Sequence, residues 1–442
     1  MKLFILLCFP LLVSLNAFAK TAPSVDEAIS KSIQYVAQKQ FQEKMDLYNK
    51  GEWPVQMKSY FLPAILGVGK LFARPTEEPT AFGTSTIINL LSEIYFVRPE
   101  LSQIPKMVND GIASLTGYEN SGIYSYYPFK QYRGTTVRGP LAEGYVPNFI
   151  AGLTNIPSDA DTTSATYMAL AYANSINTGK KLSDFAVPKE TLETFNSFRD
   201  VNRTAHYYNW LDGIKQTGAF LTWFQNEKDP AMPKGLFSKP DKGTRIPFGK
   251  NDVDCVVNAN VMRLLQSTQN TAQPGFNDSC QFLNSVILQQ KQRMCGIYYP
   301  NSYAVFFTIS NVYKAGAQCL EKSRAPAIQF IISTQKDDGS WDNEPGIGRL
   351  DNVQSTALAL NALLNYVDQG NPQYRSAVQA AVFYLLNRAK REGDDKIFWD
   401  GEVFFSAVAQ ARNTVLWRSD SYTTALAALA LVKAQTFLSA PR

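Results

Sequence analysis

Apolar residues recur at helical spacing along most of the chain. One early segment opens with the capping box Ser24-Val-Asp-Glu27, in which Ser24 accepts from a helical amide and Glu27 reaches back to the cap. Residues on one predicted helix face then follow three or four positions apart, at Val25, Ile29, Ile33 and Val36. No alternating run between Gly or Asn turns is long enough to indicate a sheet. The pattern predicts an all-α fold.

A second kind of helix is built from small and apolar residues on nearly all sides, so it must be buried on all sides. Four copies align without gaps, at Asp159-Ala-Asp-Thr-Thr-Ser-Ala-Thr-Tyr-Met-Ala-Leu170, Asp252-Val-Asp-Cys-Val-Val-Asn-Ala-Asn-Val-Met-Arg263, Asp351-Asn-Val-Gln-Ser-Thr-Ala-Leu-Ala-Leu-Asn-Ala362 and Ser419-Asp-Ser-Tyr-Thr-Thr-Ala-Leu-Ala-Ala-Leu-Ala430. Looser copies begin at Thr84 and near Ser302. Repetition of this kind indicates a repeat architecture with six units.

A short turn with an aromatic residue precedes each copy. The six turns are Gly51-Glu-Trp53, Gly122-Ile-Tyr124, Gly235-Leu-Phe237, Gly296-Ile-Tyr298, Gly339-Ser-Trp341 and Ile397-Phe-Trp399. Half-polar stretches lie between the units, such as 207–224, 278–290 and 376–387. Six buried helices alternating with half-polar ones predict an (α/α)6 toroid, a double ring that forms one domain over residues 20–442. The inner helices should be parallel and begin near Thr84, Ala160, Val253, Ser302, Asn352 and Ser421.

Composition narrows the classes of function. The 442 residues are 45% hydrophobic and 18% charged, which excludes a disordered chain. The net charge of +5 comes from 43 basic and 38 acidic residues without a basic block, so nucleic acid is not an expected partner. The single histidine, His206, is interpreted as a packing or surface residue and rules out sites that need several imidazoles. We expect no metal and no cofactor.

The N-terminus has the pattern of an export signal. Lys2 precedes the apolar run from Leu3 to Val13, and Ala17-Phe-Ala19 resembles a cleavage site, so residues 1–19 are predicted to be removed. The run is shorter than the roughly 20 residues of a transmembrane helix, and no stable membrane span is expected after cleavage. The mature protein is therefore predicted to be periplasmic or secreted. In that compartment one or two disulfides are expected, with three possible pairings among Cys255, Cys280, Cys295 and Cys319.

Parallel inner helices would bring their N-termini to the same mouth of the ring. Six aspartates occur at these helix starts, namely Asp159, Asp161, Asp252, Asp254, Asp351 and Asp420. A helix N-terminus stabilises a carboxylate by about 0.3–1 kcal/mol, so each is explained individually as a cap. In each D-x-D pair, however, one carboxylate can cap and the other is left over. We therefore expect Asp159, Asp161, Asp252 and Asp254 to share a pocket.

Two motifs resemble the terpene cyclase and protein prenyltransferase superfamily. Gln335-Lys-Asp-Asp-Gly339-Ser-Trp341 matches the Q-x-x-x-G-x-W repeat of triterpene cyclases, and Asp159-Ala-Asp161-Thr-Thr163 resembles the D-x-D-D/T-T motif of class II cyclases. The repeat-level likeness covers most of the mature chain and is squalene-hopene cyclase-like. The resemblance implies that Asp161 is the acid that protonates an alkene or epoxide. Zinc-dependent prenyl transfer is not expected, because Asp252-Val-Asp254-Cys255 has altered spacing and no histidine follows it.

The residues could support this chemistry. Burial and a neighbouring carboxylate both raise a carboxyl pKa, so Asp161 beside Asp159 could hold a proton. A carbocation then needs aromatic faces. The candidates for substrate binding lie in or just after the repeat turns and are Tyr124, Tyr126, Tyr298, Phe306, Trp399 and Phe404. The ligand would then be a small hydrophobic isoprenoid.

Two alternatives use the same residues. A carbohydrate-active toroid, a polysaccharide lyase or glycoside hydrolase, would place acid and base carboxylates about 5–10 Å apart and use tyrosines as stacking platforms for a glycan. The 22 tyrosines favour a polar ligand of this kind. A non-catalytic toroid would bind a ligand or a partner protein and use all its aspartates as caps. A dry, closed mouth would favour the cyclase, and an open, wet groove would favour the carbohydrate enzyme.

Overall fold

The computed structural model describes residues 22–45, 47–59, 75–132, 135–139, 155–228, 251–342, 352–407 and 415–440. The predicted signal peptide, the turn at 235–237 and Asp351 lie outside these residues. The predictions made for them are not tested by the structure.

Six buried helices form a closed inner ring. They are α3 (Ala81–Val97), α6 (Ala160–Thr178), α9 (Cys255–Ser267), α12 (Ser302–Lys314), α14 (Val353–Tyr366) and α16 (Asp420–Ser439). Each packs against the next along the chain, and α16 packs against α3 to close the ring. Every one begins within three residues of its predicted start. These helices are buried almost all round, as their composition predicts.

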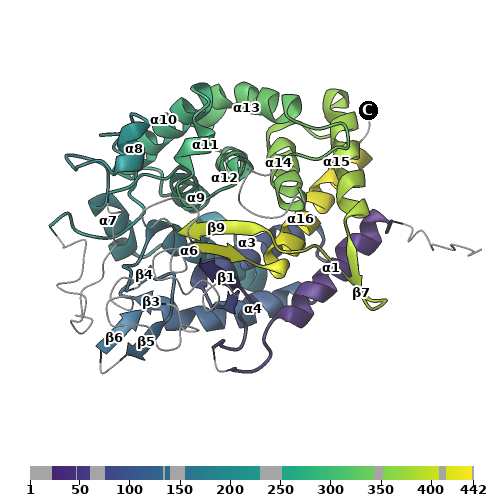
Figure 1. The fold of residues 1–442 in the computed structure, drawn as a ribbon, viewed down its shortest axis with the longest axis horizontal. Coiled ribbons are helices and arrows are strands. Elements are labelled where there is room, and N and C mark those ends of the chain that lie inside the picture. The colour runs from purple at the N-terminus through teal and green to yellow at the C-terminus, as the bar shows by residue number, and fades with distance from the viewer. Residues whose placement is uncertain are drawn as a thin grey trace, which may run out of the picture.

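A second set of helices surrounds the ring (Figure 1). They are α1 (Val25–Lys39), α4 (Ile104–Ser114), α7 (Lys189–Ser197), α10 (Pro274–Leu288), α13 (Glu321–Ser333) and α15 (Arg375–Asn387). The all-α toroid is confirmed. Two short helices, α8 (Tyr207–Leu211) and α11 (Gln292–Cys295), and four 3₁₀ turns at Leu115–Tyr118, Leu182–Asp184, Gln318–Leu320 and Pro372–Tyr374 lie in the connections.

One predicted outer helix is wrong. The stretch 207–224 is helical only in α8, and the outer helix of this unit is the earlier α7. Gly213 and Gly218 both adopt a φ of +71°, a left-handed conformation that ends a right-handed helix. No helix continues from them through Phe224, and Phe220 forms an isolated antiparallel bridge with Arg199.

The aromatic turns fasten the outer helices to the inner ring. The indole N–H groups of three tryptophans donate to backbone carbonyls of outer helices: Trp53 to Val36 at 2.8 Å, Trp341 to Ile331 at 2.7 Å and Trp399 to Leu385 at 2.9 Å. The Gln335 amide donates to the carbonyls of Gly339 at 3.0 Å and Ala377 at 2.9 Å. The Gln and Trp of the repeat motif therefore tie helix ends to the following turn.

Short strands lie over the ring, although the sequence pattern predicts no sheet. An antiparallel sheet has the order β2-β1-β10-β9 and is formed by β1 (Gln56–Ser59), β2 (Thr76–Glu77), β9 (Val403–Ala407) and β10 (Val415–Arg418). Three two-stranded hairpins are β3 (Glu119–Asn120) with β4 (Ile123–Tyr124), β5 (Phe129–Tyr132) with β6 (Thr135–Arg138), and β7 (Lys390–Glu392) with β8 (Lys396–Phe398). The expectation of no sheet is wrong because strands of two to five residues are too short to show alternation.

The four cysteines form two disulfides. Cys255 bonds to Cys295 and Cys280 bonds to Cys319, which selects one of the three pairings left open by the sequence. Within the described part of the chain, no helix combines the length and apolar character needed to cross a membrane.

Candidate functional site

The inner helices begin at one mouth, beneath the sheet. Two of the predicted aspartates are helix caps there. Asp159 accepts from the Thr162 amide at 2.6 Å and starts α6. Asp254 accepts from the amides of Val256 at 2.7 Å and Val257 at 3.2 Å and starts α9.

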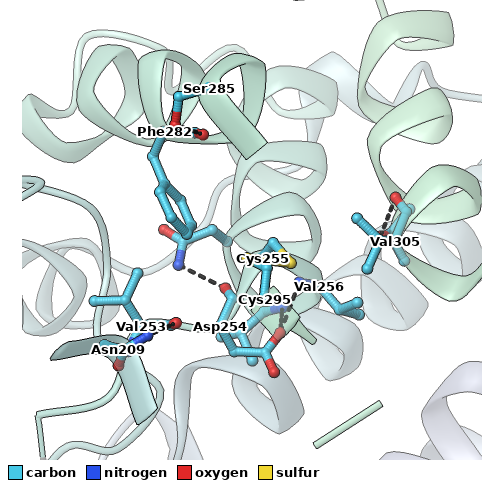
Figure 2. Close-up of a disulfide and its surroundings, with 12 residues drawn as sticks. Asn209, Val253, Asp254, Cys255, Val256, Phe282, Ser285, Cys295 and Val305 are labelled. Atoms are coloured by element: carbon cyan, nitrogen blue, oxygen red, sulfur yellow. Dashed lines mark hydrogen bonds between the residues drawn. A yellow bond between two sulfur atoms is a disulfide. The ribbon is translucent and has the colours of Figure 1, made fainter. Parts of the chain in front are cut away.

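Asp254 has a third backbone partner. Its second carboxylate oxygen accepts from the Tyr298 amide at 3.0 Å. The adjacent disulfide Cys255–Cys295 joins the same two segments, the start of α9 and the end of α11 (Figure 2). Asp254 therefore fixes the turn at 296–299 against α9, and its carboxylate is fully used in this structural role.

Asp161 lies one residue inside α6 and does not cap the helix. Its side chain is buried, with 2% of the residue exposed. The Asn260 amide group donates to one carboxyl oxygen at 2.7 Å, and the Tyr299 hydroxyl donates to the other. Burial raises the pKa of Asp161 to about 7, and the nearby Asp254 adds to this effect, whereas the two hydrogen bonds act against it. Asp161 is thus a carboxyl group that holds a proton near neutral pH.

Asp252 is a buried carboxyl outside the helix that follows it. Neither of its oxygens makes a hydrogen bond of ordinary geometry within the described residues, although the hydroxyls of Thr222 and Tyr298 lie near enough to lower its pKa. Burial outweighs these hydroxyls and raises the pKa of Asp252 to about 8. Burial raises the pKa of Asp159 to about 8 as well, with a smaller contribution from Asp161. Burial thus raises the pKa of three carboxyls at this mouth, those of Asp159, Asp161 and Asp252.

The other two mouth aspartates do not join this group. Asp420 is exposed and accepts from the Gly401 amide and, at 3.4 Å, from the Tyr35 hydroxyl. Asp351 lies outside the described residues, and α14 is capped from a distance by Glu402, which accepts from the amides of Val353 at 3.0 Å and Gln354 at 3.2 Å.

Aromatic rings close the mouth above the aspartates. We call this set the aromatic cover, and it comprises Phe82, Tyr126, Tyr298, Tyr299, Phe405 and Trp417. Phe405, on β9, is central, because its ring lies 5.0–5.9 Å from each of the other five. The Ser406 amide of the same strand donates to the Tyr298 carbonyl at 2.8 Å and holds the strand in place. All six rings are buried. The aromatic cover is therefore shielded from solvent.

Below the cover, the inner ring encloses a cavity, which we call the lumen. Its volume is about 60 Å³, and residues from all six inner helices line it. The apolar part of its wall is formed by Phe82, Leu90, Met168, Val256, Phe307 and Leu358. Asn260 and Tyr299, the two partners of Asp161, stand on the wall, and Asp161 lies directly behind them.

The opposite end of the lumen is polar. One residue from each inner helix joins a hydrogen-bonded network that we call the polar floor, and its members are Glu93, Tyr172, Arg263, Asn311, Asn365 and Lys433. These residues lie in the C-terminal halves of their helices, whereas the caps meet at the mouth. The six inner helices are therefore parallel, as predicted.

The six aromatic residues predicted to bind substrate do not line the lumen. Tyr126 and Tyr298 belong to the aromatic cover, and Phe404 packs beside it against Phe82 and Tyr422. The other three pack away from it: Tyr124 against Tyr167, Phe306 against Phe330 of α13, and Trp399 onto the Leu385 carbonyl of α15. Their proposed role in binding stays a prediction.

Sequence reasoning missed the residues that do line the lumen beside the acid. Asn260 and Arg263 lie in the second aligned copy of the repeat, at helix positions that face inward. Tyr299 and Phe307 each follow a predicted aromatic residue by one position. The helical spacing of Asn260 from the cap Asp254 was a usable signal. The contact between Tyr299 and Asp161 has no comparable signal in the sequence, because 138 residues separate the two residues.

Among the described residues no group of three or more His, Cys, Asp or Glu side chains could hold a metal ion. His206 is buried at the start of α8 and its ring lies against Tyr207 and Tyr208, which is a packing role.

The comparisons with known proteins identify the fold. No protein-family model matches the chain. A variant of the type II terpene cyclase MstE from Scytonema, in complex with its substrate geranylgeranyl dihydroxybenzoate, is 14% identical with a TM-score of 0.56 over 93% of this chain and 97% of that chain. Apo MstE is 13% identical with a TM-score of 0.55 over 94% of this chain and 99% of that chain. A protein from Actinoplanes is 12% identical with a TM-score of 0.54 over 93% of this chain and 100% of that chain. The chain therefore shares the α/α toroid fold of type II terpene cyclases.

A curated plant enzyme matches a short segment. Glucan endo-1,3-beta-glucosidase GIII of Hordeum vulgare is 25% identical over 100 residues, which are 23% of this chain. The match spans 27% of that enzyme, so the chain covers about a quarter of the length of this relative.

Proposed function

We propose that this protein is a class II, protonation-initiated terpenoid cyclase that cyclises an isoprenoid, with Asp161 as the general acid. The observation that carries the proposal is the state of Asp161. It is a buried carboxyl with a pKa of about 7, held by Asn260 and Tyr299 directly behind the wall of an aromatic lumen. A carboxyl group can act as an acid near neutral pH when its environment raises its pKa in this way.

The chemistry follows from this arrangement. The Asp161 proton adds to one carbon of an alkene, or to the oxygen of an epoxide whose C–O bond then opens, and either step leaves a carbocation on the substrate. The carboxylate that remains is stabilised by its two hydrogen bonds. The carbocation formed on the substrate is attacked by further alkenes, which closes rings, and loss of a proton ends the reaction. The faces of Phe82, Tyr299 and Phe307 line the lumen and can stabilise the cation by cation–π attraction.

Substrate binding requires the lumen to widen. Its 60 Å³ hold about four water molecules. Ligand pockets usually measure about 300–1,000 Å³. In this proposal the isoprenoid displaces side chains of the wall and reaches Asp161 between Asn260 and Tyr299.

We also propose that the protein is exported and cleaved after Ala19. The support is the signal-like pattern of residues 1–19 and the two disulfides, which persist in oxidising compartments. N-terminal sequencing of protein recovered from the periplasm or medium should start at Lys20. A full-length chain recovered from the cytosol would contradict the proposal.

Two other functions have specific support. The small volume of the lumen favours a non-catalytic toroid, in which side chains fill the ring. The similarity to the barley glucanase favours a carbohydrate-active enzyme. The second is less well supported, because all four candidate carboxylates have at most 3% of their surface exposed and so are not accessible to a glycan at the protein surface.

The test is a panel of ligands. Purified protein is incubated with linear polyprenyl compounds and, separately, with polysaccharide fragments, and binding and products are measured. A cyclase forms cyclic products that are isomers of a polyprenyl substrate. Cleavage of polysaccharide without any action on polyprenyl compounds would establish the carbohydrate enzyme, and no binding by either class would establish the scaffold.

A further inference from the structure

The polar floor is a charged network at the end of the lumen opposite Asp161. Arg263 donates to Glu93 and, at 2.6 Å, to the Tyr172 hydroxyl. Lys433 pairs with Glu93 at 3.2 Å and donates to Asn365 at 3.0 Å. These side chains are mostly buried, since 13%, 12% and 7% of the side-chain surfaces of Arg263, Glu93 and Lys433 are exposed.

The network holds more positive than negative charge. Arg263 and Lys433 share the single carboxylate of Glu93, and Lys314 lies near enough to influence both Glu93 and Lys433. Burial acts to raise the pKa of Glu93, but the three cations outweigh it and lower that pKa to about 2, so Glu93 is ionised. Burial lowers the pKa of Lys433 to about 8, and the charges of Lys314 and Arg263 contribute to this. A second anion at this place would relieve the excess.

Arg263 has donors to offer such an anion. Its hydrogen bonds to Glu93 and Tyr172 both come from Nη2. Among the described residues Nε and Nη1 have no hydrogen-bond partner, and Arg263 lies on the wall of the lumen. A guanidinium with free N–H groups on one side binds carboxylate or phosphate oxygens in a fork geometry.

The acid and the free guanidinium donors lie at different depths of the lumen. Tyr172, which contacts Arg263, follows Asp161 by eleven residues on α6, or about 16 Å along the helix axis. The wall between them is apolar and includes Met168, Phe307 and Leu358. A linear apolar chain with one charged end fits this distribution of groups, with its charge at Arg263 and its far end at Asp161.

We infer that the Arg263 end of the lumen binds an oxyanion head group, a carboxylate or a phosphate, so that the substrate is an isoprenoid acid or phosphate ester and not a neutral hydrocarbon. The inference rests on the proposed function, since it names the substrate class of the same site. The competing explanation is structural: Arg263 only neutralises Glu93 and closes the ring.

A binding experiment separates the two. Asp161→Asn is used as the background so that bound ligands are not converted. Dissociation constants are measured for a polyprenyl alcohol, carboxylic acid and phosphate ester of the same chain length. We expect at least one of the two anions to bind about tenfold or more tightly than the alcohol, in line with a charge-assisted hydrogen bond. Comparison of the acid with the phosphate identifies the head group.

Arg263→Gln should remove the preference for the anion, so that the alcohol and the anions bind this variant with similar dissociation constants. Because this variant also leaves Glu93 with one cation fewer, the double variant Arg263→Gln/Glu93→Gln restores the balance of charge. It should still lack the preference, whereas a purely structural role predicts that the preference returns. Lys189→Gln, at an 87% exposed side chain on α7, is the control for net charge and should keep the preference.

The outcomes distinguish this inference from the proposed function. Equal binding of the alcohol and both anions would overturn the inference alone. Recovery of the preference in the double variant would also overturn it alone. Failure of every polyprenyl compound to bind would overturn the proposed function and, with it, the inference.

Discussion

The pairs Asp159/Asp161 and Asp252/Asp254 align in sequence, yet their members exchange roles in the fold. In the first pair the first aspartate caps the helix and the second lies within the first turn. In the second pair the second aspartate is the cap and the first lies outside the helix. Asp161 and Asp252 are thus the carboxyls left over after capping.

A shift of two residues in the start of the helix produces this exchange. Because α6 starts at Ala160, Asp161 lies beside the lumen wall and receives hydrogen bonds from two other segments. Because α9 starts at Cys255, Asp252 stays among Thr222 and Tyr298 above the helix. A repeated motif therefore fixes where a carboxyl lies only when the helix starts at the same position in each copy.

The largest expected effect is on turnover, and it distinguishes Asp161 from Asp252, the two carboxyls that do not cap a helix. Asp161→Asn should lower turnover of a polyprenyl substrate by about 10²–10⁴-fold, the usual contribution of a general acid. Stability should change little, because Asn conserves volume. Asp252→Asn is the matched control and should keep turnover within about twofold. Steady-state rates and urea unfolding of both variants measure this, and equal rates for the two variants would remove the distinction.

The two disulfides extend the comparison. Their sequence separations are 40 and 39 residues, so loss of either should destabilise the protein similarly, by about 4 kcal/mol in the chain-entropy description. Only Cys255–Cys295 joins α9, which carries Asn260, to the turn that carries Tyr299. Replacing both of its cysteines by serine should therefore also lower turnover by about tenfold, an effect of about 1.4 kcal/mol.

The control for this prediction is the double serine variant of Cys280 and Cys319. It should lose comparable stability in urea unfolding and keep its turnover under conditions where it is folded. If both double variants lose turnover equally, the position of the Cys255–Cys295 bond has no special effect on Asp161.

The caps should matter for stability and not for chemistry. Asp254→Ala leaves three backbone amides without their acceptor, so we expect a loss of about 2 kcal/mol in the free energy of unfolding. Asp252→Asn removes no hydrogen bond of ordinary geometry and should be neutral or stabilising. Urea denaturation measures the free energy of unfolding of both variants. A larger loss for Asp252→Asn than for Asp254→Ala would show that the Asp252 carboxyl makes stabilising hydrogen bonds.

A further prediction concerns the dependence of stability on pH. The pKa of Asp252 is about 8 in the folded protein and has a reference value of 3.8, so the folded state binds more protons than the unfolded state between these values. The contribution of the protonated Asp252 carboxyl to stability is therefore fully present at acidic pH and is lost as pH rises from about 4 to about 8. In Asp252→Asn the stability should fall less over this range, as thermal unfolding across pH can measure. An unchanged pH profile would contradict the raised pKa.

The sequence predicted the ring because it is encoded locally. The stereotyped helices and the Gln335–Trp341 turn recur along the chain, and the inner helices start close to their predicted positions. The site was predicted only in part, since Asp161 was identified from its motif but its partners come from elsewhere. The sheet that carries Phe405 pairs the first unit with the last, as in the register of Met57 with Trp417, and such distant pairing leaves no local pattern.

The predicted substrate-binding residue Phe306 shows which information about the lumen is missing from the sequence. Phe306 was chosen as an aromatic residue after a repeat turn, but its ring stacks on Phe330 of the outer helix. Phe307, the next residue, lines the lumen. Successive helical residues differ by about 100° in direction, so the residue that faces the lumen can be identified only when the rotation of α12 about its axis is known. That rotation is set by packing against the neighbouring helices.

Deuterium transfer tests the central claim most directly. A turnover with a polyprenyl substrate in D₂O lets Asp161 exchange its proton for deuterium before donating it. We predict a cyclic product that carries one deuterium at the carbon protonated in the first step, and no such product from Asp161→Asn. Formation of the same labelled product by Asp161→Asn at the wild-type rate would contradict the assignment of Asp161 as the acid.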